Sequence, residues 1–265
     1  MQRIINNVKL YLKKNDKSQN VYNVLYQELV NNNFKIVDSN FDLAISIGGD
    51  GTFLKMLHEN EFNSNLYYIG INTGTLGYLP EIDPDNIISF INKLNNNAFK
   101  WQELCYIKTK VFINDNAIEY YALNEIVLRN SDLGVLQTKI DINNHFLEDF
   151  AGDGLIFSTP TGSTAYNMSL NGAIIDNSLK AYSLMPIASI NNRVFKTIPN
   201  ALILPNETKV SLTFLNKTNI LLMNDGKKNE LDNVWRIDYE MACSIKLLTV
   251  SNDNFIDILN KKIKS

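Results

Sequence analysis

The first hundred residues alternate apolar runs with amphipathic stretches, and this alternation constrains the fold more than any other feature. Residues 43–47 and 66–71 are nearly continuous apolar runs, which predicts strands buried on both faces. Residues 52–60 have the pattern of a helix, as does the segment from 18 to about 33, for which Ser18 is the candidate N-cap. Strands that alternate with helices indicate an open, parallel α/β sheet.

From about residue 101 the pattern changes to short β-rich runs separated by Asn, Asp and Gly. These runs predict a mostly antiparallel second domain, and they cover residues 107–113, 120–128, 135–142, 154–158, 201–204, 209–214, 220–223 and 244–250. One helical interruption is expected at about 162–174. We therefore divide the chain into an α/β domain (1–100), a mostly-β domain (101–250) and a C-terminal segment (251–265), a strand or helix that packs back on the first domain.

Composition excludes several classes of function. The chain of 265 residues is 45% hydrophobic and 20% charged, which rules out global disorder. It has no apolar run of about 18 residues and no secretory signal, so we expect a cytoplasmic protein that does not bind membranes. The net charge of −3 disfavours a nucleic-acid partner. Two isolated cysteines and two histidines encode neither a disulfide framework nor a metal site.

Glycine is scarce, and its placement is therefore informative. The chain has 12 glycines, where average usage would give about 19. Ten of them lie in three windows, at residues 48–51, 70–77 and 152–172. Such concentration indicates points where the backbone turns tightly or approaches a ligand.

The first two windows each follow a predicted buried strand. In the first, Gly-Gly-Asp-Gly leads into a helix, whose N-terminus offers free N–H groups to a phosphate, and Asp50 is the ionisable group of the turn. It is not a P-loop, because no Gly-Lys-Ser/Thr follows. Taken singly, the windows could be a tight turn capped by Asp50 and a connecting loop. Taken together, they favour a nucleotide cleft at the strand ends.

The third window is rich in hydroxyl groups, with Ser158, Thr159, Thr161, Ser163 and Thr164 within seven positions. Neutral hydroxyls at a helix N-terminus suit phosphate oxygens without adding positive charge to an acidic protein. The alternative is a Ser/Thr-rich turn that only caps a helix.

A polar pair, Asn124 and Glu125, interrupts an apolar run between the second and third windows. A carboxylate and an amide side by side could clamp vicinal sugar hydroxyls. The pair could equally lie on an exposed strand face or in a bulge.

Taken in order, the motifs GGDGT, INTGTLGYL, NE and GDGLIFSTPTGSTAYNMSLNGAII resemble those of the NAD kinase family, from about residue 40 to about 226. The long fourth motif is the most specific. GGDG alone is shared with diacylglycerol and sphingosine kinases and with 6-phosphofructokinases. Residues 185–193, MPIASINNR, are similar to a stretch of the compact bacterial members, and residues 224–226 resemble the family's late Asp-Gly turn.

The resemblance implies an enzyme that uses ATP to phosphorylate the 2′-hydroxyl of the adenosine ribose of NAD, which gives NADP. It implies an α/β N-terminal domain and a β-sandwich-like C-terminal domain with the cleft between them. It also implies a homodimer or homotetramer in which a neighbouring subunit completes the NAD site. Mg²⁺, or another divalent cation, would arrive with ATP, and the donor, ATP or polyphosphate, stays open.

The resemblance also assigns roles to single residues. Asp50 matches the catalytic carboxylate that would accept the proton of the 2′-hydroxyl. Residues that match the NAD-binding positions are Asp50, Gly51, Leu54, Lys55, Tyr78, Asn124, Glu125, Asp153, Thr161, Thr164, Ala165, Tyr166, Ser169, Ala188 and Asn192. Ala188 and Asn192 match contacts made by a second subunit. Ala151 departs from the family, because close relatives carry Arg there.

Two alternatives remain open beside this assignment. A lipid kinase of the same superfamily would share GGDG, but the fourth motif has the NAD kinase form. A non-catalytic module that senses NAD(H) or NADP(H) would keep the nucleotide site without turnover. The presence of Asp50 argues against that module.

Overall fold

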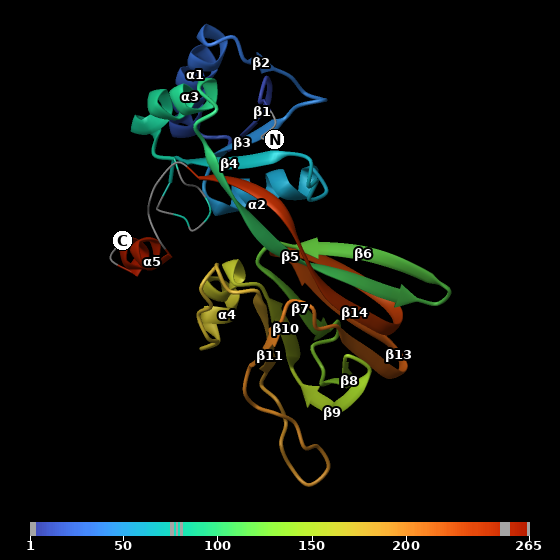
Figure 1. Cartoon of the computed structure of the whole chain (residues 1–265). Coiled ribbons are helices and arrows are strands. Elements are labelled where there is room, and N and C mark those ends of the chain that lie inside the picture. The colour runs from blue at the N-terminus through green and yellow to red at the C-terminus, as the bar shows by residue number, and fades with distance from the viewer. Residues whose placement is uncertain (1–3, 75–76, 78, 80–81, 250–254, 264–265) are drawn as a thin grey trace. The chain divides into compact units, whose positions relative to one another are not determined.

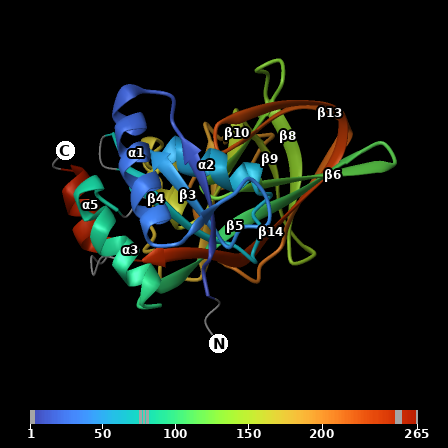
Figure 2. The ribbon, with the colours of Figure 1, turned by 90° about the horizontal axis from the view of Figure 1, so that it is seen from above.

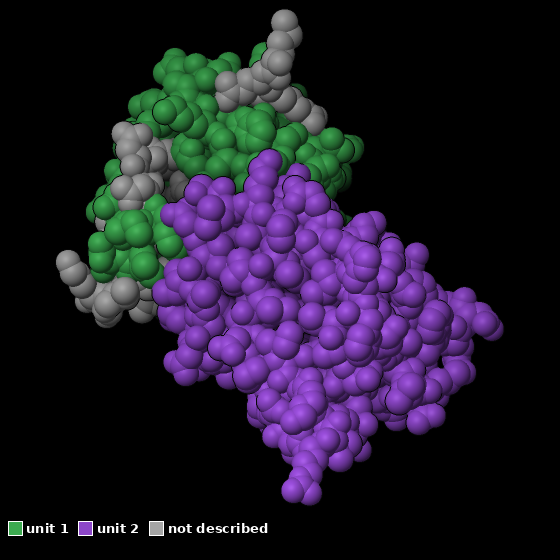
Figure 3. Space-filling view, turned by 60° about the horizontal axis from the view of Figure 1, so that its bottom comes forward, with its two compact units in different colours: residues 1–104, 244–265 green, residues 105–243 purple. Residues whose placement is uncertain are grey.

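The computed structural model describes residues 4–74, 77, 79, 82–249 and 255–263. The chain forms two compact units, coloured separately in Figure 3. Unit 1 comprises residues 1–104 and 244–265, and unit 2 comprises residues 105–243. Each unit has its own cluster of buried apolar side chains, so each is described by itself.

Unit 1 is built on a parallel sheet. Its strands are β1 (Asn7–Leu12), β2 (Lys35–Ile36), β3 (Leu43–Gly48), β4 (Tyr67–Asn72) and the last residues of β14 (Lys227–Thr249). They lie in the order β14-β4-β3-β1-β2, and Ile45 of β3 pairs with Ile69 of β4. All six residues of β3 are buried, as expected for a strand that is covered on both faces.

Helices cover both faces of this sheet. In Figure 1, α1 (Asp16–Asn31) and α3 (Ile87–Asn95) lie on one side of the strands and α2 (Asp50–Glu59) on the other. Figure 2 shows the same helices from above. The core beneath α1 and α3 takes alternate strand residues, such as Leu43, Ile45 and Ile47.

The start of α1 and the segment near the C-terminus can be compared with the expectations from sequence. Asn15, not Ser18, caps α1: its side chain accepts a hydrogen bond from the Ser18 backbone N–H at 2.8 Å. The segment near the C-terminus is a helix, α5 (Phe255–Ile263). In the part of the chain that the structure describes, no helix is both long and apolar enough to span a membrane.

Unit 2 is built from antiparallel strands. They are β5 (Lys100–Ile113), β6 (Asn116–Ala122), β7 (Glu125–Asn130), β8 (Leu136–Ile142), β9 (His145–Gly152), β10 (Gly154–Ser158), β11 (Ala181–Ile187), β12 (Leu202–Pro205), β13 (Val210–Asn224) and most of β14. The main order is β12-β11-β10-β7-β13-β14. The β8–β9 hairpin adds to β13, and the β5–β6 hairpin adds to β14. An α/β unit followed by a mostly-β unit confirms the expected fold class.

Several expected elements have different bounds. The run at 120–128 is divided between β6 and β7, and the runs at 209–214 and 220–223 are one strand, β13. The helix expected at 162–174 is replaced by a 3₁₀ turn, Thr161–Thr164, and one turn of helix, α4 (Tyr166–Ser169). It ends early because Asn171 takes a positive φ of 59° and the Asn167 amide donates to the carbonyls of Ser163 and Ala173.

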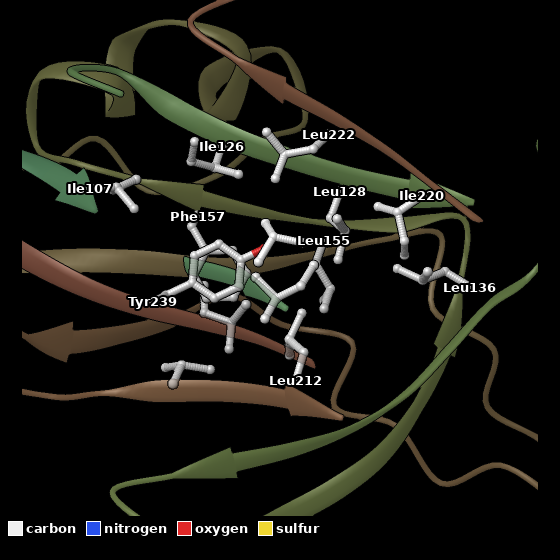
Figure 4. Close-up of a cluster of buried hydrophobic side chains, with 14 of the residues drawn as sticks. Ile107, Ile126, Leu128, Leu136, Leu155, Phe157, Leu212, Ile220, Leu222 and Tyr239 are labelled. Carbon is white, nitrogen blue, oxygen red and sulfur yellow. The ribbon is translucent and has the colours of Figure 1, made fainter. Parts of the chain in front are cut away.

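The core of unit 2 is a large cluster of aliphatic and aromatic side chains. Figure 4 shows residues of β7, β10, β13 and β14 pointing toward one another. At its centre the rings of Phe157 and Tyr239 stack with centroids 3.6 Å apart and planes 8° apart. Both side chains are fully buried, and this rigid core fixes the strands whose ends carry the site.

The two cysteines are not isolated, which corrects the expectation from sequence. Cys105 and Cys243 are joined by a disulfide although 138 positions separate them. They meet because β5 pairs with β14. The Asn206 side-chain amide lies 3.2 Å from one sulfur and 3.1 Å from the other. No spacing rule could have found this pair, because only the strand pairing brings it together.

Candidate functional site

In unit 1 the first glycine window forms a strand-to-helix turn that positions Asp50. β3 ends at Gly48, Gly49 is the extended N-cap of α2, and Asp50 is the first helical residue. A side chain on Gly48 would collide with Thr52, so glycine is needed there. One Asp50 carboxylate oxygen accepts a hydrogen bond from the Leu79 backbone N–H at 3.2 Å. The Asp50 turn therefore contacts the segment that follows the second glycine window.

The other predicted residues of unit 1 lie along α2. Gly51 is exposed and Leu54 is half-buried. Lys55 points along the helix surface, where its ammonium lies 3.5 Å from the Glu59 carboxylate, and its side chain is 75% exposed. This pairing makes Lys55 a surface residue of the helix in this structure. Tyr78 lies outside the described residues.

In unit 2 Asn124 lies in the tight connection between β6 and β7, Glu125 is the first residue of β7, and the Asp225–Gly226 turn holds the pair. Asp225 and Gly226 have φ of 47° and 82°, as the two-residue turns favoured in hairpins require. The Asp225 carboxylate accepts hydrogen bonds from three consecutive backbone N–H groups, those of Leu123, Asn124 and Glu125, at 2.9, 2.8 and 3.3 Å. The backbone of the pair is thereby fixed.

The hydroxyl-rich turn packs directly against this connection. The Thr159 hydroxyl donates to the Leu123 carbonyl at 2.6 Å, and the Thr159 N–H donates to the Asn124 carbonyl at 2.9 Å. Gly162 passes so close to Asn124 that any side chain would overlap its carbonyl oxygen. Two motifs that are 35 positions apart thus form one assembly, which we call the Asn124 assembly: Asn124, Glu125, residues 159–166 and Asp225.

Most hydroxyls of the turn build the turn itself. The hydroxyls of Ser158, Ser163 and Thr164 donate to the carbonyls of Thr159, Pro160 and Thr161. Thr159 is bonded as described above. In this structure the protons of these four hydroxyls are engaged within the protein, and the helix that follows the turn is only one turn long.

Glu125 has an unusual electrostatic environment. Burial, and then the negative charge of Asp225, raise the pKa of the Glu125 carboxyl to about 7, and a hydrogen bond from the Tyr166 backbone N–H opposes the rise. One Glu125 carboxylate oxygen, Oε2, and the Asn124 amide oxygen are buried without a hydrogen-bond partner. Unpartnered buried acceptors are rare and need an explanation. Two such acceptors lie here on adjacent residues.

The Tyr166 side chain packs over β7. Its ring packs on the small apolar cluster formed by Val127, Ile156 and Ile187. Its hydroxyl accepts a hydrogen bond from the Arg129 guanidinium at 3.2 Å. Four nearby residues also match NAD-binding positions of the family. Of these, Thr161 and Thr164 are buried, Ala165 is half-buried and Ser169 is exposed.

Asp153, Ala188 and Asn192 lie at another edge of unit 2. Asp153 is exposed in the β9–β10 turn, and its N–H donates to the Ile187 carbonyl at 2.9 Å. Ala188 follows with a φ of 45°, which is strained for a residue with a side chain. The Asn192 side-chain oxygen accepts from the N–H groups of Val194 and Phe195 at 2.8 and 2.9 Å. The structure thus brings Asp153 beside Ala188, whereas Asn192 organises its own loop.

Comparison with known proteins decides the family. A family model described as the ATP-NAD kinase N-terminal domain matches residues 6–99, and one described as the ATP-NAD kinase C-terminal domain matches residues 123–239. An NAD kinase of Finegoldia magna is 33% identical over 241 residues, which cover 88% of each chain. The chain belongs to the NAD kinase family.

Two further proteins that resemble this chain are also kinases of NAD or NADH. An NAD kinase of Staphylococcus saprophyticus is 36% identical over 233 residues, 85% of this chain and 87% of the relative. A crystal structure of yeast NADH kinase complexed with NADH superposes with a TM-score of 0.84 and covers 99% of this chain and 89% of that one. Its sequence identity is 20%, so that likeness concerns the fold.

Two residues of the site were not predicted from sequence. Asp225 was noted only as part of a turn, yet it fixes the Asn124–Glu125 backbone. Arg129 was not singled out, although it contacts Tyr166. A signal for Asp225 existed, since Asp-Gly between two strand patterns predicts a hairpin turn. No local signal pointed to Arg129.

Proposed function

We propose that this chain transfers the γ-phosphoryl group of ATP to the 2′-hydroxyl of the adenosine ribose of NAD, with NADP and ADP as products. The observation that carries the proposal is the Asn124 assembly. There the backbone of Asn124 and Glu125 is fixed by Asp225, and two adjacent acceptor oxygens have no hydrogen-bond partner within the protein. Ribose hydroxyls are donors of the required kind.

The proposed chemistry assigns Asp50 the role of general base. The bond between the ribose 2′-oxygen and the γ-phosphorus forms, the bond from that phosphorus to the ADP oxygen breaks, and the hydroxyl proton moves to the Asp50 carboxylate. A loose transition state leaves the protein mainly the tasks of positioning and charge stabilisation. General-base help of this kind contributes about 10²–10⁴-fold to the rate.

We propose that Mg²⁺, or another divalent cation, comes to the enzyme bound to ATP. Mg²⁺ prefers oxygen ligands, keeps several waters and is held largely by substrate phosphates in enzymes of this kind. Among the described residues no group of three or more His, Cys, Asp or Glu is arranged to hold a metal. The positive charge of an ion held by the phosphate oxygens would offset the negative charge of the phosphates.

We propose a cytoplasmic homodimer or homotetramer in which a second subunit adds Ala188 and Asn192 to the NAD site. The exposure of Ala188 and of the Asn192 loop supports this proposal, since a partner can reach both. Gel filtration with light scattering measures the assembly directly, and a monomer would refute it.

The decisive experiment is an assay for NADP with purified protein, Mg-ATP and NAD. We expect NADP to form, and we expect Asp50→Asn to lower kcat by about 10²–10⁴-fold without a change in thermal stability. Parallel reactions with polyphosphate, NADH and diacylglycerol identify the donor and acceptor. Binding of NAD without any product would instead support a sensing module, and unchanged turnover in the variant would remove Asp50 from its role.

A further inference from the structure

Arg129 lies on the same face of β7 as Glu125. Residues two apart on a strand share a face, so Glu125, Val127 and Arg129 form one row. Val127 belongs to the apolar cluster on which the Tyr166 ring packs. The neighbouring residues Ile126 and Leu128 point the other way, into the main core of unit 2. The row therefore lies beneath the turn that carries Tyr166.

Tyr166 is held at both ends of this row. Its backbone N–H faces the Glu125 carboxylate and lowers its pKa, and its hydroxyl accepts from the Arg129 Nη2 at 3.2 Å. The side chain thus runs along β7 from Glu125 to Arg129. Packing alone would leave the aromatic ring free to change rotamer, whereas a charge-assisted hydrogen bond at its tip fixes its direction.

The structure makes room for Arg129 to do this. On the neighbouring strand Gly154 lies beside Arg129, and a Cβ on Gly154 would come within 3.0 Å of the Arg129 Cγ and overlap the Leu128 carbonyl oxygen. The Arg129 Nε is buried and has no hydrogen-bond partner. A guanidinium that is partly removed from water at such a position costs free energy, and a surface arginine would avoid this cost.

We propose that Arg129 is a positioning residue for the nucleotide, acting through the hydroxyl of Tyr166. This inference rests on the proposed function and on the NAD-binding role that the family resemblance implies for Tyr166. Arg129 holds the ring in the orientation that the nucleotide meets, so binding does not have to restrict it. Loss of the guanidinium frees the ring and weakens NAD binding, while Asp50 and the phosphoryl donor are unaffected.

The experiment compares Arg129→Met, Arg129→Lys, Tyr166→Phe and the Arg129→Met/Tyr166→Phe double variant in steady-state assays with Mg-ATP and NAD. For Arg129→Met we expect KM for NAD to rise roughly tenfold, with kcat and KM for ATP within about twofold of wild type. Tyr166→Phe should show a similar rise, and the double variant should be no worse than either single one. Arg129→Lys keeps a donor and should recover part of the loss.

Controls separate positioning from folding and from the proposed function. Arg236→Met removes another arginine of unit 2, one that pairs with Asp238 at 2.7 Å, and should leave KM for NAD unchanged. Thermal unfolding of every variant identifies any that do not fold. If the Arg129 variants do not fold, the KM of Tyr166→Phe alone decides the test. An unchanged KM for NAD in Tyr166→Phe, or fully additive losses in the double variant, overturns the inference. Absence of NADP from the wild type instead overturns the proposed function.

Discussion

The pKa of Glu125 makes the stability of unit 2 depend on pH. Burial and Asp225 raise this pKa from 4.5 to about 7. The folded chain therefore binds the proton more tightly than the unfolded chain does. The stabilisation is fully present below about pH 4.5 and is lost as the pH rises through 7. By pH 8 the charged carboxylate costs about 3 kcal/mol.

Glu125→Gln should remove this dependence, because the amide has the same shape and does not titrate. We expect the variant to be more stable than wild type by up to about 3 kcal/mol at pH 8, and by much less at pH 5. Urea unfolding of both proteins at the two pH values measures the difference. Glu230→Gln, at an exposed site of the same unit, is the control. A gain of equal size at both pH values would contradict the raised pKa.

At the scale of elements, the contact between the hydroxyl turn and the β6–β7 connection depends on Gly162. An alanine there would overlap the Asn124 carbonyl oxygen, while the Thr159 hydrogen bonds prevent the two segments from separating. We expect Gly162→Ala to destabilise the fold by roughly 3 kcal/mol and to raise KM for NAD. Gly51→Ala is the matched control for stability, because nothing lies within 4 Å of a Cβ placed there and alanine favours a helix. Equal melting temperatures for the two variants would refute this account.

Secondary-structure elements also show which parts of the fold could be predicted from the sequence alone. The β3–turn–α2 element was predictable because a buried apolar strand, a glycine turn and a helix follow one another locally. The disulfide and the Asp225 contacts were not, because their partners lie 138 and about 100 positions apart and meet only through strand pairing. The prediction of a long helix after residue 162 was wrong for a local reason, because the Asn167 and Ser163 side chains donate hydrogen bonds to backbone carbonyls. Such contacts compete with helix formation.

For the whole molecule, the disulfide sits where the chain enters and leaves unit 2, at Cys105 and Cys243. Closing so long a loop stabilises a protein by about 2–5 kcal/mol through the entropy of the unfolded chain. Thiols in the cytoplasm stay reduced, so the proposed location requires that the reduced chain also fold and work. Reduction should lower the melting temperature of the wild type and leave its NADP formation intact. The Cys105→Ser/Cys243→Ser variant should have the melting temperature of the reduced wild type, and reductant should not change it. If reductant has no effect on wild-type melting, the bond is not formed in solution.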